Sequence, residues 1–210
     1  ADLINHTAVE ALAKWSFLHH AKLIHISTDY VFDGTSASPL KEDDATNPQN
    51  AYGKTKLRGE YAALKENPES IIIRTSWVYS EFGNNFVKTM LRLMKERDTL
   101  NVVEDQIGSP TYAKDLAQAI LDIIIKGNWQ GGIYHYSNEG AISWHEFALA
   151  IKDIAKLNCD VNGIPSSQFP TPAKRPAYSL LDKSKIKDIF GVSVPEYRSS
   201  LEKCLKAIKK

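Results

Sequence analysis

The sequence Lys22-Leu-Ile-His-Ile-Ser-Thr-Asp-Tyr30 joins a short apolar run to a polar end, and it decides the fold more than any other stretch. The apolar part is typical of a strand buried inside a parallel sheet, and Ser27 and Thr28 follow at its carboxyl end. In open α/β sheets, ligands bind at that end of the strands. The stretch therefore predicts a sheet protein with hydroxyl groups at its ligand-binding edge.

Strand-like and helix-like segments alternate along the whole chain. Helical spacing already runs from Ala1 to Ala13, and we expect further helices at 51–66, 84–97, 114–126, 144–157, 181–190 and 197–208. The predicted strands are 22–26, 71–73, 100–103 and 133–136, and the Pro-rich segment 158–180 is predicted to be irregular. This alternation predicts an α/β protein with a parallel sheet.

Composition excludes several classes of function. The 210 residues are 43% hydrophobic, and 26 basic and 25 acidic residues interleave to a net charge of +1, which argues against binding to nucleic acid or to a membrane surface. The longest apolar runs have the length of strands and no targeting signal is visible, so we expect a cytoplasmic protein. The two cysteines and the histidines His135 and His145 lack metal-ligand spacing, so no metal site is expected.

Tyr52 and Lys56 stand one turn apart at the start of the predicted helix 51–66. A cation at that distance would favour the phenolate and lower the pKa of Tyr52, which suits general acid–base chemistry. The Thr28 hydroxyl could hydrogen-bond a substrate carbonyl, although a backbone bond at the strand end would also explain it. Tyr61 and Lys65 repeat the spacing further along the helix, where packing or solvent contact is expected, so position rather than spacing carries the interpretation.

Several longer segments carry a family resemblance. They are Ser27-Thr-Asp-Tyr-Val-Phe-Asp-Gly34, Tyr52-Gly-Lys-Thr-Lys-Leu-Arg-Gly-Glu60, Arg74-Thr-Ser-Trp-Val-Tyr79, Asp105-Gln-Ile-Gly-Ser-Pro-Thr-Tyr112, Ser143-Trp-His-Glu-Phe-Ala148 and Ala173-Lys-Arg-Pro-Ala-Tyr-Ser179. In combination they resemble the dTDP-4-dehydrorhamnose reductases, a family of extended short-chain dehydrogenase/reductases. The resemblance runs from about Asn5 to the C-terminus.

The resemblance implies a fold and a reaction. The expected fold is the C-terminal part of a Rossmann-like, doubly wound parallel sheet plus a smaller mixed α/β substrate lobe. Residues 1–80 would form the catalytic half of the nucleotide-binding domain, and residues 81–210 mainly the sugar-nucleotide lobe, with about 100–126 returning to the sheet. The implied reaction reduces dTDP-4-dehydro-L-rhamnose to dTDP-L-rhamnose with NADPH or NADH, in polysaccharide biosynthesis. A homodimer is compatible with it.

The resemblance also implies roles for single residues. Thr28, Tyr52 and Lys56 match the catalytic residues, and Lys56 would also hold the nicotinamide ribose. The remaining cofactor contacts would be Asn5, Ser27 and Tyr52, and the residues lining the sugar pocket would be Asp29, Tyr30 and Trp77.

Further substrate contacts are predicted, and for most of these residues a purely structural role is an alternative explanation. Asn84 and Asn85 begin a helix whose backbone N–H groups suit a diphosphate, but helix capping explains them equally. Arg175 could pair with phosphate or remain an exposed surface residue. Gln106 would border the nucleotide base. Trp77 could stack on the hexose or pack in the core.

One departure from the family pattern concerns the cofactor. The family opens with a Gly-x-x-Gly-x-x-Gly loop that binds the pyrophosphate, and none of the 11 glycines here forms such a string. We therefore expect this 210-residue chain alone to bind NADPH poorly and to be inactive. Two other functions stay open: a regulatory subunit like the β subunit of methionine adenosyltransferase, and a reductase or epimerase of another nucleotide sugar.

Overall fold

A three-stranded parallel sheet forms the centre of the protein, as described by a computed structural model that covers residues 1–169 and 175–208. The strands are β1 (Ile24–Thr28), β2 (Ile71–Thr75) and β7 (Gly132–His135), in the order β1-β2-β7. Thr28 pairs with Thr75, so β1 and β2 end at the same edge.

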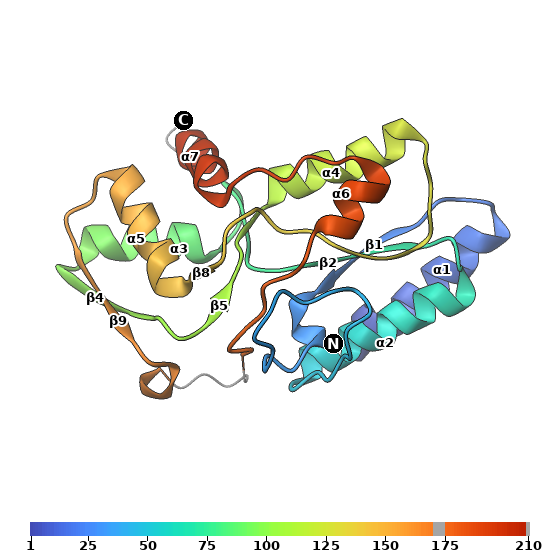
Figure 1. Cartoon of the computed structure of the whole chain (residues 1–210), viewed down its shortest axis with the longest axis horizontal. Helices are drawn as coiled ribbons and strands as arrows, with labels where there is room; N and C mark the ends of the chain where they lie inside the picture. The colour runs from blue at the N-terminus through green and yellow to red at the C-terminus, as the bar shows by residue number, and fades with distance from the viewer. Residues whose placement is uncertain (170–174, 209–210) are drawn as a thin grey trace.

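Helices cover both faces of this sheet (Figure 1). One face carries α1 (Ala8–Leu18), which follows a π-helical turn at Leu3–Thr7, and α2 (Ala51–Glu66). The other carries α4 (Ala113–Lys126) and α6 (Ser184–Phe190). All five residues of β2 are buried. Because successive strand residues face opposite sides, its continuous apolar run suits a sheet that is covered twice. The predicted α/β class with a parallel sheet is confirmed.

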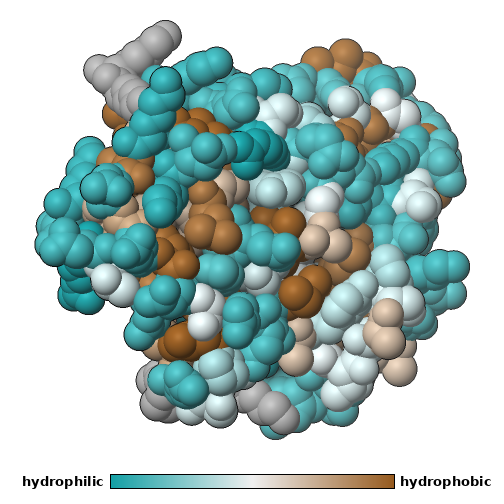
Figure 2. All heavy atoms as spheres, turned by 60° about the vertical axis from the view of Figure 1, so that its left-hand side comes forward, coloured by the Kyte–Doolittle hydropathy of each residue, from teal (hydrophilic) through white to brown (hydrophobic). Residues whose placement is uncertain are grey.

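A second lobe lies beside the sheet, on the left of Figure 1. It contains α3 (Phe86–Glu96), α5 (Trp144–Ala155), α7 (Tyr197–Ile208) and a parallel pair of β4 (Thr99–Val103) with β9 (Asp160–Ile164). Its core gathers buried apolar residues from α3, α5, α7 and β4, and the partly buried Val161 of β9 packs against them. Figure 2 shows this side covered mostly by hydrophilic residues, with hydrophobic patches between them.

Two short strand pairs lie between the sheet and the lobe. β3 (Val78–Tyr79) pairs in parallel with β6 (Thr111–Tyr112), and β5 (Ile107–Gly108) pairs antiparallel with β8 (Ile142–Ser143). Two 3₁₀ turns complete the fold, at Asp29–Val31 directly after β1 and at Ser166–Gln168.

Three sequence-based boundaries are corrected by the structure. Segment 158–180, predicted to be irregular, contains β9. The strand is not apparent from the sequence because Asn162 and Gly163 have low strand propensity. Residues 170–174 of that segment lie outside the described residues. The helix expected at 181–190 begins only at Ser184, because Leu181 forms a bridge to Leu40. The segment 100–126 divides, since β4 pairs with β9 in the second lobe while α4 packs on the main sheet.

The described residues contain two free, buried cysteines, Cys159 and Cys204. Among the helices that the structure describes, none is both long and apolar enough to cross a membrane.

Two glycines of α2 let the helix lie directly on neighbouring backbone. A Cβ atom at Gly53 would stand 2.2 Å from the Tyr30 carbonyl oxygen, and one at Gly59 would stand 2.0 Å from the Asn5 carbonyl oxygen. Real Cβ atoms do not approach that closely, so a side chain at either position would push the helix away. The first contact sets the place of Tyr52, the neighbour of Gly53.

We predict that Gly53→Ala lowers the free energy of unfolding by about 1–3 kcal/mol, because the added methyl group collides with backbone that cannot give way. Alanine's better helix propensity, about 1 kcal/mol, acts in the opposite direction. Lys54→Ala, an exposed position on the same turn, is the matched control and should stay within about 0.5 kcal/mol. Urea unfolding measures both. A Gly53→Ala protein as stable as the control would contradict the close-contact explanation.

Candidate active site

Thr28 is the last residue of β1, and its hydroxyl makes two local hydrogen bonds. Its Oγ1 donates to Asp29 Oδ1 at 3.1 Å and accepts the backbone N–H of Tyr30 at 3.2 Å. Burial raises the pKa of Tyr52 above its usual value, and a side-chain hydrogen bond with Thr28 partly offsets that rise. The structure thus brings Thr28 and Tyr52 together, as the sequence predicts.

The start of α2 fixes the Tyr52 backbone. Asn50 is the N-cap, and its side chain accepts the Gly53 N–H at 2.8 Å. The Tyr52 ring meets the Tyr30 ring edge-on, with centroids 5.8 Å apart. About half of the Tyr52 side chain remains exposed, so the phenol borders a surface that a ligand can reach.

Lys56 lies against β1 rather than toward the phenol. Its Nζ is 3.1 Å from His25 Nε2 and donates to the Ile26 carbonyl. Burial lowers the pKa of His25 to about 4, and the charge of Lys56 contributes to this lowering. The imidazole is therefore neutral at neutral pH and accepts the hydrogen bond from Lys56 Nζ. The predicted lowering of the Tyr52 pKa by Lys56 is therefore wrong: burial of the phenol dominates and raises it. Tyr52 keeps its proton at neutral pH.

Asp29 is a buried carboxyl group with an unused oxygen. Its side chain is 2% exposed, and Oδ2 has no hydrogen-bond partner among the described residues. Burial raises the pKa of Asp29 to about 6, and hydrogen bonds with Ser179 and Thr28 hold it from rising further. Tyr30 stands beside it; burial raises the pKa of Tyr30, and the nearby Arg175 charge acts to lower it. An acceptor and two phenols thus lie near Thr28, and the exposed Arg175 carries its charge near Tyr30.

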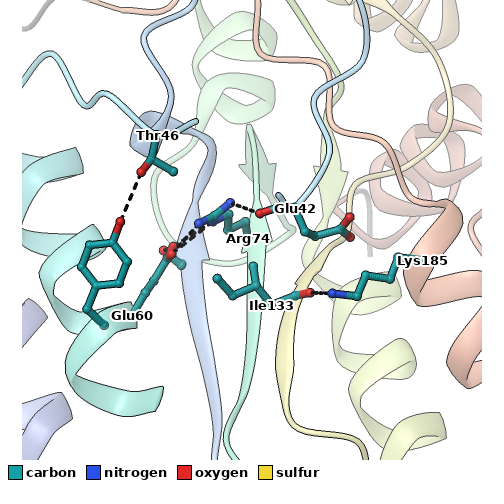
Figure 3. A network of polar contacts seen from close by, with 8 residues as sticks. Glu42, Thr46, Glu60, Arg74, Ile133 and Lys185 are labelled. Carbon is teal, nitrogen blue, oxygen red and sulfur yellow. Dashed lines mark hydrogen bonds and ion pairs between the residues drawn. The ribbon is translucent and has the colours of Figure 1, made fainter. Parts of the chain in front are cut away.

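A fully buried ion pair lies beneath this edge of the sheet (Figure 3). Arg74 Nη2 is 2.7 Å from Glu60 Oε2, and Arg74 Nε also donates to both Glu60 oxygens. Arg74 belongs to β2, and Ser27 of the neighbouring strand β1 donates its hydroxyl to Glu60 Oε1. Figure 3 shows the guanidinium between Glu60 and the Glu42 carbonyl oxygen, to which Nη1 donates at 3.3 Å. Ser27, predicted as a cofactor contact, uses its hydroxyl inside the protein.

The same network ties the loop after β1 to β7. Glu42 Oε1 accepts the His135 N–H at 2.9 Å, and His135 Nδ1 lies 3.1 Å from the Leu40 carbonyl oxygen. Burial lowers the pKa of His135 to about 3, so this histidine is a neutral structural group. His145 likewise faces a backbone carbonyl, that of Val161, at 3.1 Å. No group of three or more metal-ligating side chains occurs in the part of the chain that the structure describes.

The remaining predicted contacts have varied surroundings. Asn5 donates its side-chain amide to Thr55 Oγ1 at 3.0 Å. Asn85 caps α3 by accepting the Lys88 N–H, while Asn84 is exposed and stands before the helix. This corrects the expected helix 84–97, which spans 86–96 because the cap lies outside it. Gln106 is half-buried between β4 and β5. The substrate and cofactor roles of these residues stay predictions.

Sequence reasoning missed His25, Ser179 and the pairing of Glu60 with Arg74. The Glu60–Arg74 pairing has a signal in the sequence. Each charged residue lies within an element predicted to pack in the core, and a buried charge needs a partner of opposite sign. His25 left none: a histidine within a strand is usually structural, and only the fold shows its contact with Lys56.

Comparison with known proteins decides the family. The family model described as "RmlD substrate binding domain" matches residues 1–210. A dTDP-4-dehydrorhamnose reductase of Aggregatibacter actinomycetemcomitans is 44% identical over 209 residues, which cover 95% of this chain and 71% of the relative. The chain belongs to the dTDP-4-dehydrorhamnose reductase family. The reductase of Salmonella typhimurium is 42% identical, covering 98% of this chain and 72% of its own length.

Solved structures of the family have the same fold. The dTDP-4-dehydrorhamnose reductase of Bacillus anthracis, in complex with NADP, superimposes with a TM-score of 0.94 at 39% identity, over 99% of this chain and 73% of that one. The family member from Clostridium acetobutylicum gives 0.93 at 40% identity, with the same coverage. A Rossmann-like architecture for the sheet and its helices is therefore established.

The buried Asp29 predicts an unusual pH dependence. Its folded pKa, about 6, lies above the ordinary 3.8, so the unfolded chain loses its proton first as the pH rises. Wild-type stability should therefore fall through this window, and Asp29→Asn should gain about 2–3 kcal/mol on the wild type between about pH 4 and pH 7.

Urea unfolding at several pH values measures this difference. Asp33→Asn is the control, because hydrogen bonds from Thr35 lower the pKa of Asp33 below its ordinary 3.8. Its charge therefore stabilises the fold throughout the range from about pH 4 to pH 7, and the effect of this substitution should not change across that range. A stability difference between Asp29→Asn and wild type that does not change with pH would rule out the assigned pKa.

Proposed function

We propose that this chain carries the catalytic centre and sugar-nucleotide lobe of a reductase that converts dTDP-4-dehydro-L-rhamnose to dTDP-L-rhamnose with NADPH or NADH. The observation that carries the proposal is the Thr28–Tyr52 pair at the sheet edge, beside the buried Lys56. Relatives named for this reaction, at more than 40% identity, support it. Residues 1–80 would supply the catalytic half and 81–210 mainly the substrate lobe.

The residues of the chain fit one end of a nicotinamide nucleotide. Lys56 is held in one position by His25 and Ile26, close to Tyr52, where it could bind the ribose hydroxyls. Asn5 bonds Thr55 of the same helix. Ser27 lies in β1, the strand that Lys56 contacts, with its hydroxyl bonded to Glu60. The nicotinamide would supply a hydride to C4 of the sugar. The pyrophosphate would need a Gly-rich loop, for which this sequence has no string.

Proton transfer would fall to Tyr52. As the C4 carbonyl becomes an alkoxide, the phenol donates its proton to that oxygen and recovers one from solvent afterwards. Its raised pKa keeps it protonated at neutral pH, as a general acid requires. The Thr28 hydroxyl, which donates to Asp29 in the free protein, would turn to steady the developing charge.

Substrate binding would use the groups around these two residues. The unused Oδ2 of Asp29 can accept a sugar hydroxyl, and Tyr30 and Trp77 would border the hexose. Arg175 would pair with the diphosphate. We extend the same proposal to three positions along the lobe, Asn84, Asn85 and Gln106, as contacts of the nucleotide.

The test is turnover by a chimera in which the N-terminal segment of the Salmonella typhimurium reductase precedes this chain. Tyr52→Phe should lower kcat by about 10²–10⁴-fold with little change in KM for the sugar nucleotide, because only the proton donor is lost. Tyr61→Phe, further along the same helix, should leave both constants unchanged.

A panel of 4-keto nucleotide sugars decides between the functions left open by the sequence. Turnover confined to a sugar other than dTDP-4-dehydro-L-rhamnose would favour a different reductase or epimerase. Absence of turnover on every member, with capture of a synthetase partner, would favour a regulatory subunit.

A further inference from the structure

Trp77 is stacked face to face on a second indole, Trp144. Their ring centroids are 3.6 Å apart and the ring planes differ by 11°. Phe86 packs on Trp144 from another direction, with centroids 4.7 Å apart. Trp144 is the first residue of α5, where Ser143 and Glu146 form a complete capping box. The helix start therefore holds Trp144 firmly, and Trp144 in turn covers one face of Trp77.

The backbone of Trp77 is strained. Its φ is +49°, in the left-handed region that bulky residues avoid, and only His20 and Lys156 share such a value among the described non-glycine residues. Hydrogen bonds on both sides maintain this conformation: the Trp77 carbonyl accepts the Thr111 N–H at 3.2 Å, and Ser76 Oγ donates to the Ser109 carbonyl at 2.7 Å. The fold thus holds this indole in place against a local preference.

Gly108 leaves room for the same indole. A Cβ atom there would lie 2.8 Å from two carbons of the Trp77 ring and 2.9 Å from Ser179 Oγ. The ring and this hydroxyl therefore border the same glycine. Ser179 also hydrogen-bonds Asp29, the neighbour of Thr28. A chain of contacts through Gly108, Ser179 and Asp29 thus links the Trp77 ring to the Thr28 hydroxyl.

We propose that Trp144 is a positioning residue that fixes the Trp77 indole as one wall of the hexose site. This inference rests on the proposed function, in which Trp77 borders the hexose. Trp144 blocks one face of Trp77, so the hexose meets the ring from its remaining side. Neither indole takes part in proton transfer. Loss of Trp144 should therefore affect recognition of the sugar and leave recognition of the nucleotide intact.

The experiment measures two properties of this 210-residue chain. Circular dichroism reports the exciton couplet that two stacked indoles produce, and calorimetry gives the affinities for dTDP and for dTDP-L-rhamnose. Trp144→Leu should abolish the couplet and weaken dTDP-L-rhamnose by about two- to tenfold, the range expected for one aromatic pair. The affinity for dTDP should not change. Trp144→Phe should also lose the couplet but recover most of the sugar affinity, because its ring still supports Trp77.

Gly108→Ala tests the same wall without touching Trp144. The methyl group would displace the Trp77 ring, so the couplet should weaken and dTDP-L-rhamnose alone should bind less well. Trp15→Phe is the control, since Trp15 is 57% exposed on α1 and should alter neither the couplet nor the affinities.

Three results would overturn the proposal: a couplet that persists in Trp144→Leu, an equal loss of affinity for dTDP and dTDP-L-rhamnose, or wild-type binding of the two with the same affinity. Equal affinity of the wild type for dTDP and dTDP-L-rhamnose would mean that Trp77 makes no favourable contact with the hexose. Turnover by the chimera is measured separately, so a failure of this inference is distinguishable from a failure of the reductase function.

Discussion

The ion pair between Glu60 and Arg74 is the contact on which the edge of the candidate active site depends. Both side chains are at most 2% exposed, and each would be an uncompensated buried charge without the other. The pair joins α2 to β2, and the Ser27 hydroxyl adds the end of β1 to the same carboxylate. Thr28 is the next residue, so this polar contact helps to fix its position.

One face of α2 contributes three polar side chains to the candidate site and its support. Tyr52, Lys56 and Glu60 are spaced by four residues, which places them on successive turns of that face. Along it, the phenol meets Thr28, the ammonium meets Ile26 and the carboxylate meets Ser27. Burial lowers the pKa of Lys56, and the Glu60 charge opposes that change. The ion pair thus helps to keep the buried Lys56 ammonium charged, besides fixing the strand.

The sequence predicted those parts of the fold that are governed by local pattern. The apolar run of β2 and the Asn50 cap of α2 are local signals, and both elements occur where expected. β9 was missed because its pairing with β4 outweighs the poor strand preference of Asn162 and Gly163. The direction of Lys56 could not be predicted either, because spacing along a helix does not show which neighbour an ammonium contacts.

The central claim is that Glu60 and Arg74 act as one unit, and a double-mutant cycle measured by urea unfolding tests it most directly. Glu60→Leu and Arg74→Met should each lower the free energy of unfolding by about 3–5 kcal/mol, since each leaves a buried charge unpaired. The double variant should lose much less than the sum of the two. Small, additive losses like those of an exposed pair such as Arg92 with Glu96 would contradict the claim.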